Sequence, residues 1–173
     1  MQLISELYDQ SENDEDGSSL NRYERQKLRE QWILGKFTEK YNRYASPRMI
    51  YAKLSESPDF EVYDLFGNKI CNIEITEAVN VYYRLQKRKI RNDPDRRRSP
   101  SNCISVLERL ISKKNRMFYP KHTILVIYLD NSFSFNHQLE YDVFFHLALP
   151  VKINLSQIWL IDSFHEHRVI QLC

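Results

Sequence analysis

The sequence predicts an α/β fold in which a mixed central sheet is flanked by helices. Apolar residues recur at helical spacing between residues 21 and 44, which indicates an amphipathic helix. Residues 60–66 and 69–76 begin with alternating apolar and polar side chains, the pattern of half-buried strands. Residues 123–129 are continuously apolar, which is typical of a strand covered on both faces. Helices and strands mixed along 173 residues favour one layered α/β domain.

The first predicted helix runs from residue 21 to about residue 44. Asn21 lies three residues before Glu24, which is the spacing of a capping box at a helix start. The apolar stripe of this helix is formed by Leu28, Trp32, Ile33, Phe37 and Tyr41. Ser46 and Pro47 then indicate another helix start, leading into a short segment at residues 49–54.

The second half of the chain alternates between helical and strand patterns. Helices are predicted over residues 77–90, 103–118 and 138–149, and strands over residues 123–129, 158–162 and 168–172. Ser101 or Asn102 is the expected cap of the helix at 103–118. The inner stripe of that helix contains Ile104, Leu107, Leu110 and Ile111.

Charge is distributed unevenly between the amino-terminal segment and the rest of the chain. Residues 1–19 are predicted to be an acidic flexible segment, and residues 20–173 the folded domain. Residues 1–21 contain six acidic side chains and no Lys or Arg, so the rest carries 25 basic against 17 acidic residues. A basic body of this kind indicates a polyanionic partner.

The two strands at 60–66 and 69–76 are predicted to form a hairpin with acidic side chains on one face. Gly67 and Asn68 between them are typical of a two-residue turn, which would pair Phe66 with Lys69. That register places Asp59 opposite Thr76, and Glu61 opposite Glu74, with all four side chains on one face.

Paired carboxylates on one face indicate a site for a hard divalent cation. Asp59 and Glu74 would be diagonal neighbours, with backbones roughly 7–8 Å apart. Mg²⁺ prefers oxygen ligands and usually takes one or two carboxylates, keeping water and substrate phosphate for its other positions. A solvated edge hairpin, whose charges oppose aggregation, is the alternative interpretation.

Pro58-Asp59, followed after fourteen residues by Glu74-Ile75-Thr76, resembles the motif of the PD-(D/E)xK, or restriction-endonuclease-like, nuclease superfamily. The resemblance covers roughly residues 20–130 in the order of elements. It implies a restriction-endonuclease-like mixed sheet and Mg²⁺- or Mn²⁺-dependent hydrolysis of DNA phosphodiester bonds.

The resemblance also implies roles for individual residues. Asp59, Glu74 and the carbonyl oxygen of Ile75 would bind the metal, and a glutamate of the first helix, Glu24 or Glu30, would join through water. Thr76 stands where the family has its lysine, and Lys113 or Lys114 of the 103–118 helix is expected to project back toward the site. Because Thr76 supplies no positive charge, a nuclease-like fold that binds nucleic acid or a protein without cutting is the alternative.

A dense basic segment follows the hairpin and is expected to bind nucleic acid. Such a segment positions phosphates without reading sequence, so DNA is the expected partner and RNA remains open. A solvated loop without a partner is the alternative interpretation. The basic residues are Arg84, Lys87, Arg88, Lys89, Arg91, Arg96, Arg97 and Arg98.

The remaining sequence features concern the cellular compartment, membrane association and oligomeric state. Cys71, Cys103 and Cys173 form no CxxC pair, which favours the reducing cytoplasm, and the first two are expected to be small buried hydrophobes. The longest apolar run, residues 123–129, is far shorter than the roughly 20 residues of a membrane span, so no membrane association is expected. No basic region precedes an apolar stretch at the amino terminus, so no signal peptide is predicted. A homodimer is left open, because many enzymes of this resemblance cut with two sites.

Overall fold

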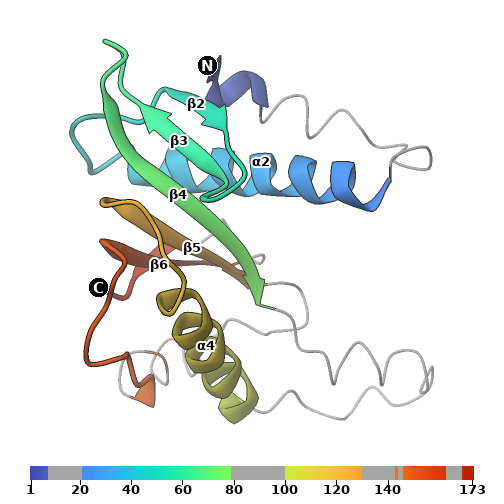
Figure 1. Cartoon of the computed structure of the whole chain (residues 1–173), viewed down its shortest axis with the longest axis vertical. Coiled ribbons are helices and arrows are strands. Elements are labelled where there is room, and N and C mark those ends of the chain that lie inside the picture. Colours follow the sequence, from blue (N-terminus) through green and yellow to red (C-terminus); the bar gives the residue numbers. More distant parts are fainter. Residues whose placement is uncertain (8–20, 79–99, 130–142, 144–145, 163–168) are drawn as a thin grey trace.

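A long central strand, β4 (Lys69–Ala78), joins an antiparallel and a parallel half of one sheet (Figure 1). The structure is a computed structural model, and it describes residues 1–7, 21–78, 100–129, 143, 146–162 and 169–173. Within these residues, seven strands lie in the order β1-β2-β3-β4-β5-β6-β7. The other strands are β1 (Gln2–Leu3), β2 (Tyr51–Leu54), β3 (Phe60–Tyr63), β5 (Thr123–Leu129), β6 (Gln157–Asp162) and β7 (Val169–Gln171).

Strands β1 to β4 are antiparallel neighbours, β4, β5 and β6 are parallel, and β7 returns antiparallel to β6. The predicted α/β class with a mixed sheet is therefore confirmed. None of the described helices combines the length and the apolar character needed to cross a membrane.

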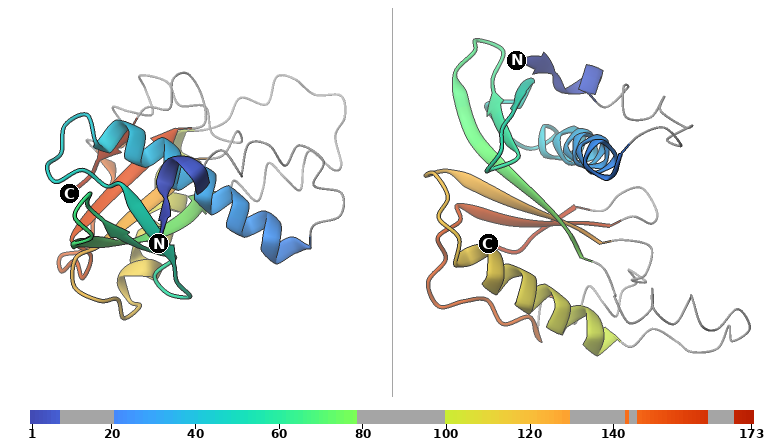
Figure 2. Two further views of the ribbon diagram at one scale, coloured as in Figure 1. Left: turned by 90° about the horizontal axis from the view of Figure 1, so that it is seen from above. Right: turned by 45° about the vertical axis from the view of Figure 1, so that its right-hand side comes forward.

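Two helices, α2 (Arg22–Tyr41) and α4 (Pro100–Asn115), cover opposite faces of this sheet (Figure 2). On the α2 side, Ile73 and Ile75 of β4 join the helix residues Ile33, Leu34 and Phe37 in one buried cluster. A second buried cluster on the α4 side is formed by residues that include Cys103, Leu107, Ile111, Leu125 and Ile127. Because side chains alternate along a strand, β4 and β5 contribute to both clusters.

The first helix begins and ends close to the predicted residues. The Asn21 side chain accepts hydrogen bonds from the backbone of Tyr23 and Glu24, and the Glu24 carboxylate accepts one from the backbone of Asn21 at 2.7 Å. The predicted capping box is thus confirmed.

The helix start predicted at Ser46 and Pro47 is wrong, since the following residues form β2. The side chain of Asn42 bonds both the carbonyl and the N–H of Met49, which turns the chain from the end of α2 into this strand.

Several other helices begin or end at residues that differ from the predicted ones. The predicted helix at 77–90 is wrong at its start, because Glu77 and Ala78 continue β4 in parallel pairing with β5; residues 79–90 lie outside the described residues. The helix at 103–118 instead begins at Pro100 and ends at Asn115. Of the helix predicted at 138–149, residues 143 and 146 are helical, residues 147–149 are not, and the others lie outside the described residues. Strands predicted at 123–129, 158–162 and 168–172 are confirmed within one residue at each end.

The prediction of a two-residue turn between β3 and β4 is wrong, and so is the strand register that this turn implies. Tyr63 pairs with Lys69, so the connection spans residues 64–68. The register Phe60 with Ile73 and Glu61 with Asn72 brings Asp59 opposite Glu74 by continuation, whereas the sequence places it opposite Thr76. The shift is two residues, which by itself would keep strand side chains on their faces. The carboxylate of Asp59 is nevertheless held on the α2 side and that of Glu74 on the α4 side, so the prediction that they share one face is wrong.

Asp64 explains the longer turn. Its Oδ1 atom accepts backbone hydrogen bonds from Phe66 and Asn68, both at 2.8 Å, and its Oδ2 atom accepts one from the Asn68 side chain at 3.0 Å. Gly67 completes the loop with φ of 80°, a left-handed conformation that glycine adopts without strain. These hydrogen bonds, that from the Asn68 side chain first, hold the pKa of the Asp64 carboxyl below its ordinary value of 3.8.

Replacing Asp64 with Asn is expected to lower stability in a pH-dependent way. Because the folded-state pKa of Asp64 is depressed, its contribution is present above pH 3.8 and is lost as the pH falls through the folded-state pKa. Urea unfolding of wild type and Asp64→Asn should therefore differ most at neutral pH and converge at strongly acidic pH. The exposed Glu56, in the connection between β2 and β3, provides the control variant Glu56→Gln. A pH-independent difference for Asp64→Asn would contradict the assignment.

Candidate metal and phosphate site

Asp59 and Glu74 are buried near the start of β3. Beyond this point β4 has no neighbouring strand on its β3 side. Asp59 directly precedes β3 and is 8% exposed, and Glu74 lies in the middle of β4 and is 6% exposed. Buried carboxylates are rare unless they are paired, so the partners of each carboxylate define what this site can do.

The Asp59 carboxylate takes the place of a strand neighbour for β4. Its Oδ2 atom accepts a hydrogen bond from the backbone N–H of Ile75 at 2.8 Å. The N–H and the C=O of one strand residue point to the same neighbour. The carbonyl oxygen of Ile75 therefore faces the same side of β4 as Asp59, as the sequence-based ligand set requires.

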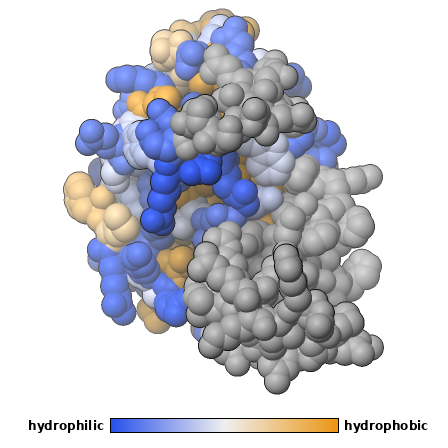
Figure 3. Space-filling view, turned by 90° about the vertical axis from the view of Figure 1, so that its right-hand side faces the viewer, coloured by the Kyte–Doolittle hydropathy of each residue, from blue (hydrophilic) through white to orange (hydrophobic). Residues whose placement is uncertain are grey.

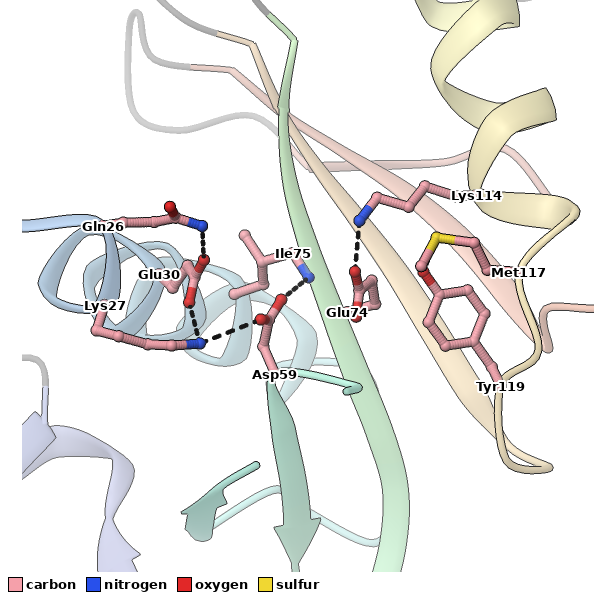
Figure 4. Close-up of polar contacts among 9 residues, drawn as sticks. All are labelled: Gln26, Lys27, Glu30, Asp59, Glu74, Ile75, Lys114, Met117 and Tyr119. Atoms are coloured by element: carbon pink, nitrogen blue, oxygen red, sulfur yellow. Dashed lines mark hydrogen bonds and ion pairs between the residues drawn. The ribbon is translucent and has the colours of Figure 1, made fainter. Parts of the chain in front are cut away.

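From α2, Lys27 reaches the other oxygen of Asp59. Its Nζ atom lies 3.3 Å from Asp59 Oδ1 and 2.8 Å from Glu30 Oε2, and Gln26 donates to the remaining Glu30 oxygen at 2.8 Å (Figure 4). Burial alone would lower the pKa of Lys27, but the hydrogen bond and charge of Glu30, together with Asp59, raise it above 10.5. The ammonium form is therefore the resident form.

On the α4 side, Lys114 donates to Glu74 Oε1 at 2.5 Å, and the two side chains are 16% and 8% exposed. Tyr119 is buried beside this pair and donates to the sulfur of Met117 at 3.3 Å. Burial, and then the charge and hydrogen bonding of Glu74 and the charge of Asp59, raise the pKa of Tyr119. Its hydroxyl therefore remains a hydrogen-bond donor next to the carboxylates.

The lysine that the sequence assigns to the site does reach it. Lys114 projects from α4 onto Glu74, whereas the neighbouring Lys113 is exposed. Thr76 follows on the same face of β4 and is partly buried. Lys114 thus brings to Glu74 the positive charge that Thr76 does not supply. The catalytic role of Lys114 stays a prediction.

The assignment of Glu24 to the metal is not supported, because its carboxylate caps the start of α2. Glu30, the other first-helix candidate, is the residue that contacts the site through Lys27. The basic segment with Arg84, Lys87, Arg88, Lys89, Arg91, Arg96, Arg97 and Arg98 lies outside the described residues.

Sequence reasoning assigned no role to Gln26, Lys27 or Tyr119. Lys27 and Glu30 have the i, i+3 spacing of helical neighbours, which was the available signal. That spacing does not reveal which helix face meets the hairpin.

The oxygen donors suit a hard cation of modest coordination demand. Asp59 and Glu74 offer carboxylates and Ile75 a carbonyl, and Mg²⁺ typically fills its other positions with water and phosphate. Among the described residues no cluster of three or more His, Cys, Asp and Glu side chains is arranged to hold a metal. The residues present therefore fit an ion that shares the site with solvent and substrate, and do not form a closed protein cage.

A further ionic contact lies along β4 beyond the site. Arg29 of α2 bonds Glu77 at 2.5 Å, and its guanidinium group stands 5.2 Å from the ring centre of Tyr128. The side of the molecule that looks onto the start of α2 and the end of β4 is dominated by hydrophilic residues in its described part (Figure 3). Such a surface suits a charged partner better than an apolar one.

The pairing of Glu74 with Lys114 is expected to contribute to stability. Removing one partner of a buried pair costs roughly 3–5 kcal/mol, and the partial exposure of Lys114 places Lys114→Met near the lower value. In the double variant Lys114→Met/Glu74→Gln, about 1–2 kcal/mol should return, because no uncompensated charge remains.

Urea unfolding at pH 7 measures this double-mutant cycle. The exposed pair Lys69 and Glu61, 2.7 Å apart on the same hairpin, is the matched control and should couple by less than about 1 kcal/mol. Additive losses at Lys114 and Glu74 would show that the contact contributes nothing.

Comparison of this chain with protein-family models, with curated proteins and with solved structures finds no match in any of the three. The chemistry of the site therefore rests on its own geometry.

Proposed function

We propose that this chain is a metal-dependent endonuclease of restriction-endonuclease-like fold, which hydrolyses DNA phosphodiester bonds with Mg²⁺ or Mn²⁺. One observation carries the proposal: two buried carboxylates, Asp59 and Glu74, flank the central strand β4, and a lysine reaches each of them from a different helix (Figure 4). Acids and lysines placed along a central strand are groups that phosphodiester hydrolysis needs.

The order of elements supports the resemblance on which the nuclease class rests. Between residues 22 and 129 the described chain forms a long helix, an antiparallel sheet carrying Asp59 and Glu74, a second helix, and a strand parallel to β4. Proteins of unrelated function share folds, so the residues of the site and not the fold carry the activity.

Each residue of the site has a distinct role in this proposal. Asp59, Glu74 and the carbonyl of Ile75 would hold the ion, which polarises the phosphodiester and acidifies a water molecule when it is bound. Lys114 holds Glu74 in place and supplies positive charge for the attacking water or the phosphate. Thr76 offers a hydroxyl on the same face of β4, as a hydrogen-bonding group without charge.

Partner and location belong to the same proposal. The basic residues between 84 and 98 would hold the DNA backbone, with RNA as the second polyanion to test. The cytoplasm is the proposed compartment, in keeping with the free thiols of Cys71 and Cys103, whose burial raises their pKa to about 12.

A second candidate function is nucleic-acid binding without cleavage. The observation that favours it is the pairing itself, because Lys27 and Lys114 already neutralise Asp59 and Glu74. In that case the four charged groups would stabilise the fold, and the chain would bind a polyanion as a recognition module.

Cleavage assays on plasmid, single-stranded DNA and RNA with Mg²⁺ or Mn²⁺ separate the two candidates. Asp59→Asn and Glu74→Gln should each lower the cleavage rate at least about 100-fold, because each removes charge that holds the ion. Lys114→Met should lower the rate by a similar factor while nucleic-acid binding is retained.

Glu61→Gln and Lys69→Met are the controls, since they remove an acid and a lysine from the same hairpin outside the site. Wild-type binding without cleavage of any substrate would favour the recognition module. Equal cleavage by wild type, Asp59→Asn and Glu74→Gln would refute the assignment of the site.

A further inference from the structure

Lys27 is a partly buried cation that lies between two carboxylates. Its side chain is 18% exposed, and those of Glu30 and Asp59 are 8% and 12% exposed. An ammonium group withdrawn from water to this extent needs close oxygen partners to offset its lost hydration. Lys27 is therefore part of the site and not a surface ion pair.

The two carboxylate contacts of Lys27 are unequal. The distance from Nζ to Glu30 is 2.8 Å, which is typical of a charge-assisted hydrogen bond, whereas the distance to Asp59 is 3.3 Å. Gln26 donates a hydrogen bond to the other oxygen of Glu30, which restricts movement of the glutamate side chain. Lys27 is thus anchored on Glu30 and held more weakly by Asp59.

Asp59 has the converse arrangement. Its Oδ2 atom is fixed by the backbone N–H of Ile75 at 2.8 Å, which keeps the carboxylate in place whatever binds the other oxygen. Its Oδ1 atom contacts only Lys27 among the hydrogen bonds and ion pairs found in the described part of the chain. Oδ1 is therefore the oxygen that can change partners at least cost (Figure 4).

We propose that Lys27 is a resident counter-ion that neutralises Asp59 until a metal ion binds. It binds Oδ1 in the metal-free protein, gives up that oxygen when a divalent ion binds, and remains anchored on Glu30. This inference rests on the proposed metal site and adds a competing cation from the first helix, distinct from Lys114.

The charges of the site agree with such an exchange. Three carboxylates, Glu30, Asp59 and Glu74, face two ammonium groups, Lys27 and Lys114, which leaves a formal charge of −1. One divalent ion added without loss of Lys27 changes this to +1, which a single phosphodiester neutralises. Exchange at Asp59 therefore makes the site ready for phosphate, whereas expulsion of Lys27 would not.

Binding of Mn²⁺ in the absence of nucleic acid tests the inference, with free Mn²⁺ measured by electron paramagnetic resonance. Lys27→Met removes the competing charge and should bind Mn²⁺ at least about tenfold more tightly than wild type, since a charge-assisted contact no longer has to be broken. Lys40→Met, in the last turn of the same helix, is the matched control and should bind like wild type.

The failures of the two proposals are distinguishable. Asp59→Asn should lose Mn²⁺ binding, and equal binding by Asp59→Asn and wild type would refute the metal site itself. Loss in Asp59→Asn with unchanged or weaker binding in Lys27→Met would leave the metal site intact and refute the role of Lys27.

Thermal unfolding provides a readout that a merely structural lysine would not move. Without metal, Lys27→Met should melt below wild type, and Mn²⁺ should raise its melting temperature by more than it raises that of wild type. An equal rise in both would contradict the proposal. Lys27→Gln, which still donates to Glu30 without charge, replaces Lys27→Met if the latter folds poorly, and a failure of Mn²⁺ to restore its stability would count against the inference.

Discussion

The site depends on one hydrogen bond, from the backbone N–H of Ile75 to the carboxylate of Asp59. β3 begins only at Phe60, so β4 has no strand partner on that side beyond Ile73. A buried N–H left without a partner would cost about 1–3 kcal/mol, and the side chain of Asp59 satisfies it. The same hydrogen bond holds the carboxylate of Asp59 next to β4. One interaction therefore both satisfies the backbone of β4 and positions the acid.

Around this bond the site draws on both layers of the fold. Lys27 comes from the helix that covers one face of the sheet, and Lys114 from the helix that covers the other. Each lysine sits where its helix packs against β4, so the apolar clusters on the two faces also position the charged groups.

The hairpin shows how a local signal can be overruled by another local interaction. Gly67 and Asn68 favour a two-residue turn, but the carboxylate of Asp64 captures the backbone of Phe66 and Asn68 and closes a longer loop. The resulting register differs from the predicted one by two residues, and a shift of two preserves the faces of a strand. Asp59 is therefore brought level with Glu74 and not with Thr76, and the two carboxylates are paired with lysines from different helices.

The sequence by itself determined the α/β class, the capping box of α2, the apolar stripes of both helices and the buried strand β5, because periodicity and caps are local properties. It also singled out Asp59 and Glu74, and offered Lys113 or Lys114 as the lysine of the site. Only the tertiary structure decided that Glu30 is the first-helix glutamate that reaches the site, and that Lys27 pairs with Asp59. Those choices depend on how α2 is rotated against the sheet, and that rotation is set by packing between segments far apart in the chain.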